Sequence, residues 1–279
     1  MIKGLTRAGL GQTPPLPEFV SLASRYGFGA VDAGGSELEA WIDAAGTEGV
    51  RQVLKEQDVI IGSIGLSPEW RQSEEVFRAG LPRLVKDGEA AAKLGVTRCC
   101  TYVLPSTDYP SAHFMAVATR RMRTCAEMLG AYGIRLGLEF VGPHHLRTRW
   151  KHPFIWTPEE TLDWIDAIGC SNVGLLYDAY HWYTTGGTID DIRKLRADQI
   201  VHVHINDAKD VPFSEVLDND RVYPGEGVID LAAFLQGLQE IGYRGVVAQE
   251  ILTPQPPAEP AEELLARSRE GFVKVWRCS

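Results

Sequence analysis

Four polar residues stand at or near the ends of apolar segments in the second half of the sequence. They occur in the contexts LGLEF, LLYDAYH, VHVHIND and VVAQEIL, and are Glu139, Asp178, His204 and Glu250. Each carboxylate taken alone would more often be a surface residue. Brought together, three carboxylates would repel one another unless a cation lay between them. Three oxygen donors and one nitrogen donor suit Mn²⁺, Mg²⁺, Co²⁺ or Zn²⁺, so the pattern predicts a site for one divalent metal ion.

Four further residues have side chains that could contact a ligand. His181 follows Asp178 by three residues, where a histidine is as readily part of a loop or of a helix start. Arg221 precedes a turn rich in proline and glycine, where it would either reach a substrate oxygen or lie on the surface. Trp70 and Trp182 would either form an apolar wall for a ligand or pack in the core. We keep all four as candidate substrate-binding residues.

Two other histidine-containing features lie close to the predicted ligands. We expect His202 to point away from His204, toward the helical layer, as a packing residue or a support for the ligands. The segment 144–152 is rich in basic and aromatic residues and is typical of a solvated loop. Its position after a predicted strand also makes it a candidate lid over the site.

An alternation of apolar and amphipathic segments must position these residues. The strand-like segments are apolar on both faces, as is typical of parallel strands covered by helices, and span residues 2–5, 29–34, 59–66, 97–104, 134–141, 172–180, 199–206 and 245–252. The helical patterns span residues 17–25, 37–45, 74–94, 111–132, 158–168, 189–195, 231–241 and 260–276. Thr157 and Glu160 form a predicted capping box, and Gly169 stands where that helix should end.

Strands and helices in this alternation predict an α/β fold, a single (β/α)8 TIM barrel over residues 1–279, rather than a doubly wound sheet. In such a barrel, catalytic groups lie at the carboxyl ends of the strands. The four predicted metal ligands fall on predicted strands five to eight, one on each. Their side chains are therefore expected to meet at one rim of the barrel.

The overall composition narrows the range of partners. The chain has 279 residues, 44% of them hydrophobic, and a net charge of −9, which disfavours nucleic acid and anionic lipid as partners. The five cysteines are odd in number and none are spaced as CxxC, so we expect neither a disulfide framework nor a cysteine zinc site. No apolar leader and no run of about 18 apolar residues occurs, so we expect a cytoplasmic protein without a membrane partner.

Several common catalytic motifs are missing from the sequence. No GxGxxG or GxxxxGK[ST] follows the early strands, which weakens a dinucleotide or nucleotide function. GxSxG is absent as well, so a serine hydrolase is not indicated. No lysine stands at the end of predicted strands five, six or eight, so a Schiff-base aldolase has no good candidate for its amine.

The segments that carry the predicted ligands resemble those of a known family. Residues 134–251 are similar to the xylose-isomerase-like TIM barrel superfamily in LGLEF, in the D-x-x-H of LLYDAYH, in the H-x-N-D of VHVHIND, and in DRVYPGEGVID followed by AQEIL. That superfamily contains sugar isomerases, ketose 3-epimerases, inosose isomerases and dehydratases, and endonuclease IV.

The isomerase and epimerase branch implies specific roles for the matching residues. Glu139 and Glu250 would act as acid and base on opposite faces of the substrate, while His181 and Arg221 would hold its hydroxyl or carbonyl oxygens. Mn²⁺ is the expected ion, with Mg²⁺, Co²⁺ or Zn²⁺ as alternatives. The resemblance implies that this single ion is bound by Glu139, Asp178, His204 and Glu250.

The nuclease branch of the superfamily fits this sequence poorly. Its trinuclear zinc site takes additional histidines from early strands, whereas no histidine precedes His113 here. Its D-R-H ligand motif aligns with Asp220–Arg221–Val222, so an aliphatic residue stands at one ligand position. The net charge of −9 also disfavours a nuclease, because it repels the phosphate backbone of nucleic acids.

The resemblance implies a metal-dependent isomerase or epimerase that acts on a ketose or keto-polyol through an enediolate, which a metal ion on the carbonyl would stabilise. The alternatives are a dehydratase or lyase acting on a keto-inositol or 3-keto-sugar at the same site, and a non-catalytic sugar-binding barrel. The expected partner is a small polyhydroxy carbonyl compound. A homo-oligomer or a partner subunit, as some relatives have, stays open.

Overall fold

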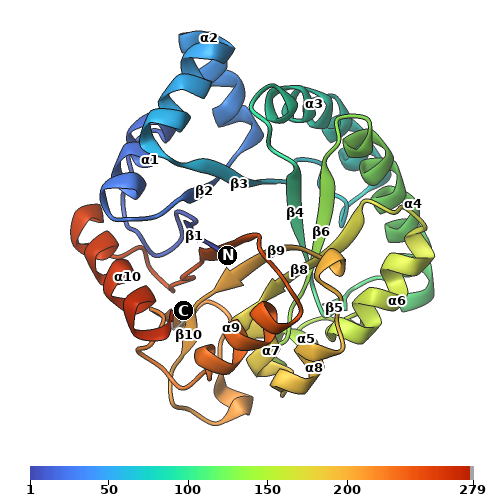
Figure 1. Cartoon of the computed structure of the whole chain (residues 1–279). Helices are drawn as coiled ribbons and strands as arrows, with labels where there is room; N and C mark the ends of the chain where they lie inside the picture. The colour runs from blue at the N-terminus through green and yellow to red at the C-terminus, as the bar shows by residue number, and fades with distance from the viewer. Residues whose placement is uncertain (277–279) are drawn as a thin grey trace.

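Parallel strands close into a barrel at the centre of the molecule (Figure 1). This computed structural model describes residues 1–276, so Cys278 lies outside the described residues. Strands follow one another around the barrel in sequence order, and the last pairs with the first, with Ile2 opposite Val246. The barrel strands are β1 (Ile2–Leu5), β2 (Ala30–Ala33), β3 (Ile60–Gly65), β4 (Arg98–Val103), β6 (Arg135–Phe140), β8 (Val173–Asp178), β9 (Ile200–Ile205) and β12 (Val246–Gln249). The predicted (β/α)8 TIM barrel is confirmed.

Helices surround the barrel and cover the outer faces of its strands (Figure 1). The main ones are α1 (Leu16–Arg25), α2 (Gly35–Gln57), α3 (Glu74–Lys93), α4 (Ser111–Gly130), α6 (Pro158–Ile168), α8 (Ile189–Arg193), α9 (Leu231–Glu240) and α10 (Ala261–Val275). The main apolar core lies between strands and helices, and Leu138, Val203 and Phe234 belong to it. Within residues 1–276, no helix has both the length and the apolar character needed to cross a membrane.

The ends of α6 follow the local sequence signals. The hydroxyl of Thr157 accepts a hydrogen bond from the backbone N–H of Glu160, whose carboxylate accepts one from the N–H of Thr157 in return. This is the predicted capping box. The helix ends at Gly169, whose φ of 75° lies in the left-handed region that favours glycine.

Helix α2 extends well beyond the predicted helix at 37–45. The backbone at Gly46 has φ 71° and ψ 156°, which interrupts the helix where the prediction ended. A second helical segment then continues to Gln57, and its Val50 and Leu54 are buried in the core. Its sequence, TEGVRQVLKEQ, has few apolar residues, so the helical pattern is weak there.

Short elements occupy several of the loops that connect the barrel strands and the helices. One small antiparallel pair joins the loops after β4 and β6, and another lies within the loop after β9. None of these elements was predicted, because segments of a few residues are too short to show a periodic pattern. They are β5 (Ser106–Thr107), α5 (His144–Arg147), β7 (His152–Pro153), α7 (Ala179–Thr184), η1 (Ala197–Gln199), β10 (Asp207–Ala208), η2 (Phe213–Glu215) and β11 (Arg221–Val222).

The inside of the barrel contains small side chains that leave room for polar ones. Ala30, Val246 and Ala248 form an apolar cluster that is separate from the main core. A β-carbon at Gly62 would lie 2.5 Å from Oδ1 of Asp32 and 3.3 Å from Val246, so glycine leaves the room that this carboxylate occupies. The barrel interior can therefore hold polar groups that extend toward its carboxyl end.

Candidate metal centre

The four predicted ligands converge at the carboxyl end of the barrel. Glu139 lies near the end of β6, and Asp178 is the last residue of β8, directly opposite His204 of β9. Glu250 follows β12, and its backbone N–H still donates to the carbonyl of Ile205, as in the strand pairing. One ligand atom from each of the four side chains lies within 4.8 Å of the others. The structure thus brings together all four residues selected from the sequence.

His204 lies at the centre of this group. Its Nδ1 is 3.4 Å from Oε1 of Glu139, 3.5 Å from Oε2 of Glu250 and 3.8 Å from Oδ2 of Asp178. Within the described part of the chain, Nδ1 of His204 and Oε1 of Glu139 are buried without a hydrogen-bond partner. Buried polar atoms are seldom left unpaired, because losing water without a replacement costs free energy. Three carboxylate oxygens and one imidazole nitrogen facing one point fit a divalent cation.

The two glutamates have different electrostatic surroundings. Burial raises the pKa of Glu139, and the nearby charge of Glu250 raises it further against the opposing effect of His204. Burial would also raise the pKa of Glu250, but the charges of His204 and Arg221 outweigh it and lower that pKa to about 2. Burial lowers the pKa of His204, but Glu250 and Asp32 outweigh it and hold that pKa well above its ordinary value.

Arg221 is buried beside the predicted ligands and is not a surface residue. Its Nη1 lies 3.0 Å from Oδ2 of Asp178 and 3.0 Å from Oε2 of Glu250. Its Nη2 donates to Oδ1 of Asp218 at 2.9 Å, and the guanidinium carbon lies 4.8 Å from the centre of the Tyr180 ring. Arg221 also opens β11, whose pairing with β10 holds the backbone in place. The guanidinium therefore faces the site with its donors.

His181 occupies the first turn of α7 and is also buried. Its Nδ1 accepts a hydrogen bond from the backbone N–H of Gly142 at 3.2 Å, so a neutral ring carries its proton on Nε2. That Nε2 lies 3.5 Å from Nη2 of Arg221 and 3.9 Å from Oδ1 of Asp218. A β-carbon at Gly142 would collide with the hydroxyl of Thr184, so glycine is needed where the segment after β6 approaches α7.

Trp70 and Trp182 both have partners in the packed layer outside the barrel. The indole N–H of Trp70 donates to the hydroxyl of Thr101 at 3.1 Å, and its ring stacks on Phe114 at 5.9 Å. The ring of Trp182 lies 5.3 Å from Phe234 of α9, and its N–H donates to the carbonyl of Thr188. Core packing, the alternative left open by the sequence, describes both residues in this structure.

The segment 144–152 is tied to its surroundings at several points. Arg147 donates to the carbonyl of Gly142 at 2.6 Å and to that of Thr184 at 2.7 Å. Ser106 donates to the carbonyl of Leu146 at 2.5 Å. Helix α5 contacts η2, so the loops after β6 and β9 meet here. These contacts hold the segment in one arrangement, and its role as a lid stays a prediction.

The expected direction of the His202 side chain was wrong, because residues two apart on a strand point to the same face. His202 and His204 both point into the barrel, with ring centres 5.4 Å apart. Nε2 of His202 lies 2.8 Å from Oδ2 of Asp32. The same Asp32 oxygen lies 3.5 Å from Nε2 of His204.

Sequence reasoning missed three residues of the site. Asp32 lies near the end of an apolar strand in GAVDAG, which is the same signal that identified the four ligands. The side-chain amide of Asn206 donates to both carboxylate oxygens of Asp178 at 3.1 Å, and this residue is the N of the H-x-N-D motif. Asp218 lies in an irregular loop, and no sequence pattern identifies its contact with Arg221.

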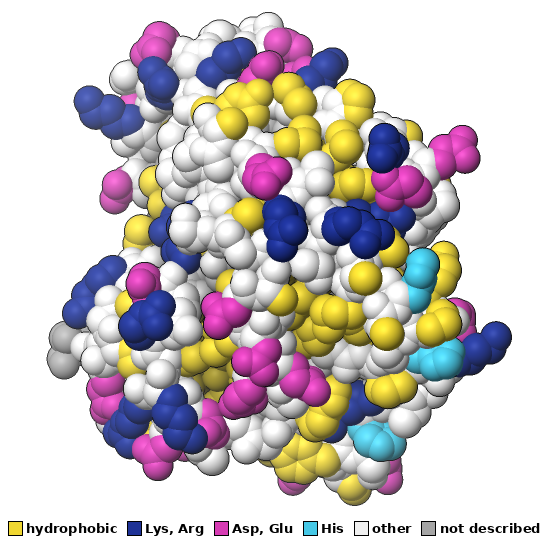
Figure 2. Space-filling model, turned by 90° about the vertical axis from the view of Figure 1, so that its right-hand side faces the viewer, with side chains coloured by type: hydrophobic (Ala, Val, Ile, Leu, Met, Phe, Trp, Pro, Cys, Tyr) yellow, Lys and Arg dark blue, Asp and Glu magenta, His cyan; other side chains and the backbone are white. Residues whose placement is uncertain are grey.

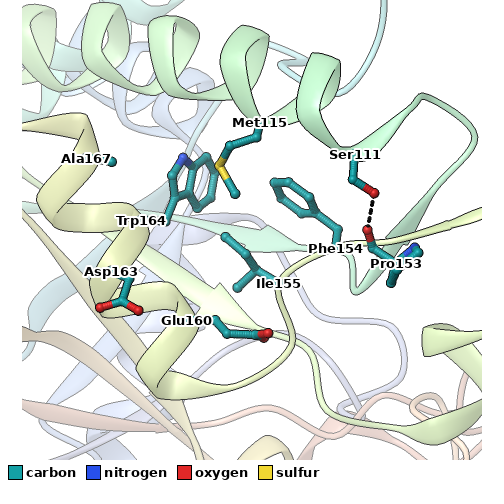
Figure 3. Close-up of a pocket in the computed structure, with 9 residues that line it drawn as sticks. All are labelled: Ser111, Met115, Pro153, Phe154, Ile155, Glu160, Asp163, Trp164 and Ala167. Carbon is teal, nitrogen blue, oxygen red and sulfur yellow. Dashed lines mark hydrogen bonds between the residues drawn. The ribbon is translucent and has the colours of Figure 1, made fainter.

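A separate groove lies on the outer surface between α4 and α6, and none of the four candidate ligands lines it. Figure 2 shows the face on the right of Figure 1, where hydrophobic side chains gather among charged ones. Figure 3 shows Met115, Phe154, Ile155 and Trp164 around the groove, whose volume is about 580 Å³. Its Glu160 belongs to the capping box of α6. Asp163 is the other carboxylate among its lining residues, so the groove lacks a converging set of acids, bases or ligands like that of the candidate metal centre.

Residues 20–271 match the family model of the xylose isomerase-like TIM barrel. An inosose isomerase of Bacillus velezensis is 37% identical over 146 residues, which are 52% of this chain and 49% of that protein. The matched region thus spans about half the length of this curated relative.

Two solved structures have the same architecture. A xylose isomerase domain protein from Alicyclobacillus acidocaldarius aligns with a TM-score of 0.89 and 34% identity, covering 99% of this chain and 98% of that one. The IolI protein, solved with a zinc atom, aligns with a TM-score of 0.80 over 99% of this chain and 98% of that one. At 22% identity, the second likeness concerns the fold alone.

Proposed function

This chain belongs to the xylose isomerase-like TIM barrel family, and from that premise we propose that it is a divalent-metal-dependent isomerase or epimerase of a ketose or keto-polyol. The proposal depends on one observation, the convergence of four ligand atoms within 4.8 Å at the carboxyl end of the barrel. The similarity to an inosose isomerase supports the substrate class, a polyhydroxy carbonyl compound.

Glu139, Asp178, His204 and Glu250 are the residues proposed to hold the cation. Their chemistry fits one, because unpaired buried atoms of Glu139 and His204 face the same point. The zinc atom in the IolI structure supports a metal in this fold. We propose Mn²⁺ as the ion, with Mg²⁺, Co²⁺ or Zn²⁺ as alternatives. When bound, such an ion polarises a substrate carbonyl and stabilises the negative charge that develops on its oxygen.

Glu139 and Glu250 are the proposed acid and base. They come from the ends of β6 and β12, which are separated in the barrel by β8 and β9, so the two carboxylates approach the centre from different sides. One carboxylate removes the proton from the carbon next to the carbonyl, and the electron pair of that C–H bond moves into the enediolate. The other glutamate, as the acid, returns a proton to carbon. Return to the opposite face of the same carbon gives an epimer. Return to the former carbonyl carbon, together with transfer of a proton from the neighbouring hydroxyl oxygen to the former carbonyl oxygen, gives an isomer.

Arg221 and His181 are the proposed substrate-holding residues. The guanidinium presents donors beside Asp178 and Glu250, and the Nε2–H of a neutral His181 lies next to it. A ketose carries oxygens on successive carbons, so two neighbouring donors can fix its orientation relative to the two glutamates. In this arrangement Arg221 would also offset part of the negative charge of the cluster.

The test of the proposal is exchange of the α-proton with solvent. The Mn²⁺-loaded protein is incubated in D₂O with a panel of ketoses and inososes and followed by ¹H NMR. We expect loss of the α-proton signal of at least one sugar, together with the appearance of its isomer or epimer. Exchange with loss of water would instead favour a dehydratase or lyase, and sugar binding without exchange would favour a non-catalytic barrel. Omitting the metal is the matched control.

A further inference from the structure

Asp32 lies next to Nε2 of His204, on the side of the ring that faces away from Glu139, Asp178 and Glu250. Nδ1 of His204 faces the oxygens of Glu139, Asp178 and Glu250 at 3.4–3.8 Å. Nε2 of the same ring lies 3.5 Å from Oδ2 of Asp32, at the outer limit of hydrogen-bond distance. Asp32 belongs to β2 and His204 to β9, so this contact crosses the interior of the barrel.

His202 and Gly62 hold the Asp32 carboxylate in this position. Nε2 of His202 lies 2.8 Å from Oδ2 of Asp32, and His202 is fully buried. Nδ1 of His202 has no hydrogen-bond partner among the described residues, which assigns the ring proton to Nε2, where Asp32 accepts it. A side chain at Gly62 would displace Asp32, because its β-carbon would lie 2.5 Å from Oδ1. The carboxylate therefore has a built place inside the barrel.

The chemistry of imidazole connects this contact to metal binding. A neutral imidazole carries one proton, and the nitrogen that binds a metal must be without it. If Nδ1 of His204 binds the ion, then Nε2 carries the proton, and Asp32 is placed to accept it. A carboxylate behind a metal-binding histidine fixes the tautomer and ring orientation and makes the ligand more basic.

We propose that Asp32 is a positioning residue that holds His204 as a metal ligand through Nδ1, and that His202 keeps Asp32 in place. This inference deepens the proposed function, because it rests on the same metal site. It gives the first half of the barrel a role at the site, although none of the four proposed ligands comes from its strands. It also explains why the fully buried His202 is paired with a carboxylate inside the barrel.

The experiment measures zinc affinity and the protonation of His204 in the same protein. Zinc binding is measured by competition with a chelator for the wild type, Asp32→Asn and Asp87→Asn. Asp87 is a matched control, since it is likewise an aspartate paired with a basic side chain, but its partner is Arg83 on the outside of the barrel. We expect Asp32→Asn to weaken zinc binding by about 10- to 100-fold and Asp87→Asn to leave it unchanged.

Nitrogen-15 NMR of the zinc-loaded wild type gives a readout that does not depend on the folding of any variant. We expect the long-range spectrum of His204 to show zinc on Nδ1 and a proton on Nε2. Zinc on Nε2 would overturn the inference, because Asp32 and His202 would then lie next to the ion as ligands. Equal zinc affinity of wild type and Asp32→Asn would also overturn it. A wild type that binds no divalent metal would instead contradict the proposed function itself.

Discussion

The two halves of the barrel have the same architecture and differ in what their strands carry at the carboxyl end. Strands β6, β8, β9 and β12 each carry a candidate ligand at or directly after their ends. In the first half, β1, β3 and β4 end in Leu5, Gly65 and Val103, and β2 carries Asp32. Closure of the barrel needs apolar strands in both halves, whereas the chemistry needs only one side of the rim. This asymmetry shows that the fold and the site impose separate demands on the sequence.

Asp32, on β2 in the first half, contacts two histidines of β9 in the second half. Its carboxylate reaches His202 at 2.8 Å and His204 at 3.5 Å across the barrel. In this proposal the strands of the second half provide the metal ligands, and Asp32 of the first half holds one of them, His204, in position. Substitutions in the second half should accordingly affect catalysis, metal binding and substrate binding, and those in the first half chiefly stability and the support of His204.

The largest effect is expected for a proposed proton-transfer residue of the second half. Glu250→Gln keeps the size of the side chain but removes its base, so the rate of α-proton exchange should fall by about 10²- to 10⁴-fold, while some metal affinity is retained. Glu240→Gln is the control, because Glu240 pairs with Arg193 on the surface. An unchanged exchange rate in Glu250→Gln would refute the role of Glu250 as acid or base.

A large effect on stability is expected for Arg221→Met. This change leaves Asp178 and Glu250 without the guanidinium that lies 3.0 Å from both, and loss of one partner of a buried ion pair costs about 3–5 kcal/mol. Mn²⁺ should restore part of the loss, because it would neutralise the same carboxylates. Urea unfolding with and without Mn²⁺ measures both quantities.

Arg193→Met, which breaks exposed ion pairs with Asp190 and Glu240, serves as the control for Arg221→Met. This substitution should cost little stability, and that small cost should be the same with and without Mn²⁺, because the proposed metal site stays intact. If Mn²⁺ stabilised the wild type and Arg221→Met to the same small extent, the carboxylates near Arg221 would not be the metal site.

A smaller effect, on substrate binding, is expected for His181→Ala. Removing a donor to a substrate oxygen costs about 1–3 kcal/mol, so kcat/KM should fall roughly 5- to 150-fold, chiefly through a higher KM. Steady-state kinetics with the sugar identified by proton exchange measures this. His113→Ala, on an exposed position of α4, should change neither constant. Full activity of His181→Ala at low substrate concentration would reject the assignment.

The smallest effect is expected in the first half, for Trp70→Phe. The change removes the hydrogen bond from the indole N–H to Thr101 and should cost about 0.5–1.5 kcal/mol of stability. Metal affinity and KM should stay as in the wild type, because the indole packs against Phe114 outside the barrel. A higher KM with unchanged stability would restore Trp70 as part of a ligand wall.

Much of the site was predictable because its residues interrupt a strong pattern. Glu139, Asp178, His204 and Glu250 each stand in or after an apolar strand, where a charged group has no structural reason to lie. Asp32 carries the same signal in GAVDAG but lies far from the other four in the sequence. Its contact with β9 depends on closure of the barrel, which brings distant strands face to face.

Other features depend on tertiary packing that a local pattern does not contain. Trp70 follows a predicted strand and Trp182 follows His181 in the sequence. The rings of both nevertheless point into the helical layer. Sequence spacing alone does not show which way a side chain in a loop turns. The contact of Asp218 with Arg221 arises in a loop without periodicity. The error on His202 was of a different kind, because the two-residue period of a strand already places it beside His204.

Anomalous diffraction from crystals soaked with Mn²⁺ would show directly where the ion binds. We expect one strong peak at the carboxyl end of the barrel, within bonding distance of Glu139, Asp178, Nδ1 of His204 and Glu250. A peak between Asp32, His202 and Nε2 of His204, or no peak near the two glutamates, would contradict this expectation.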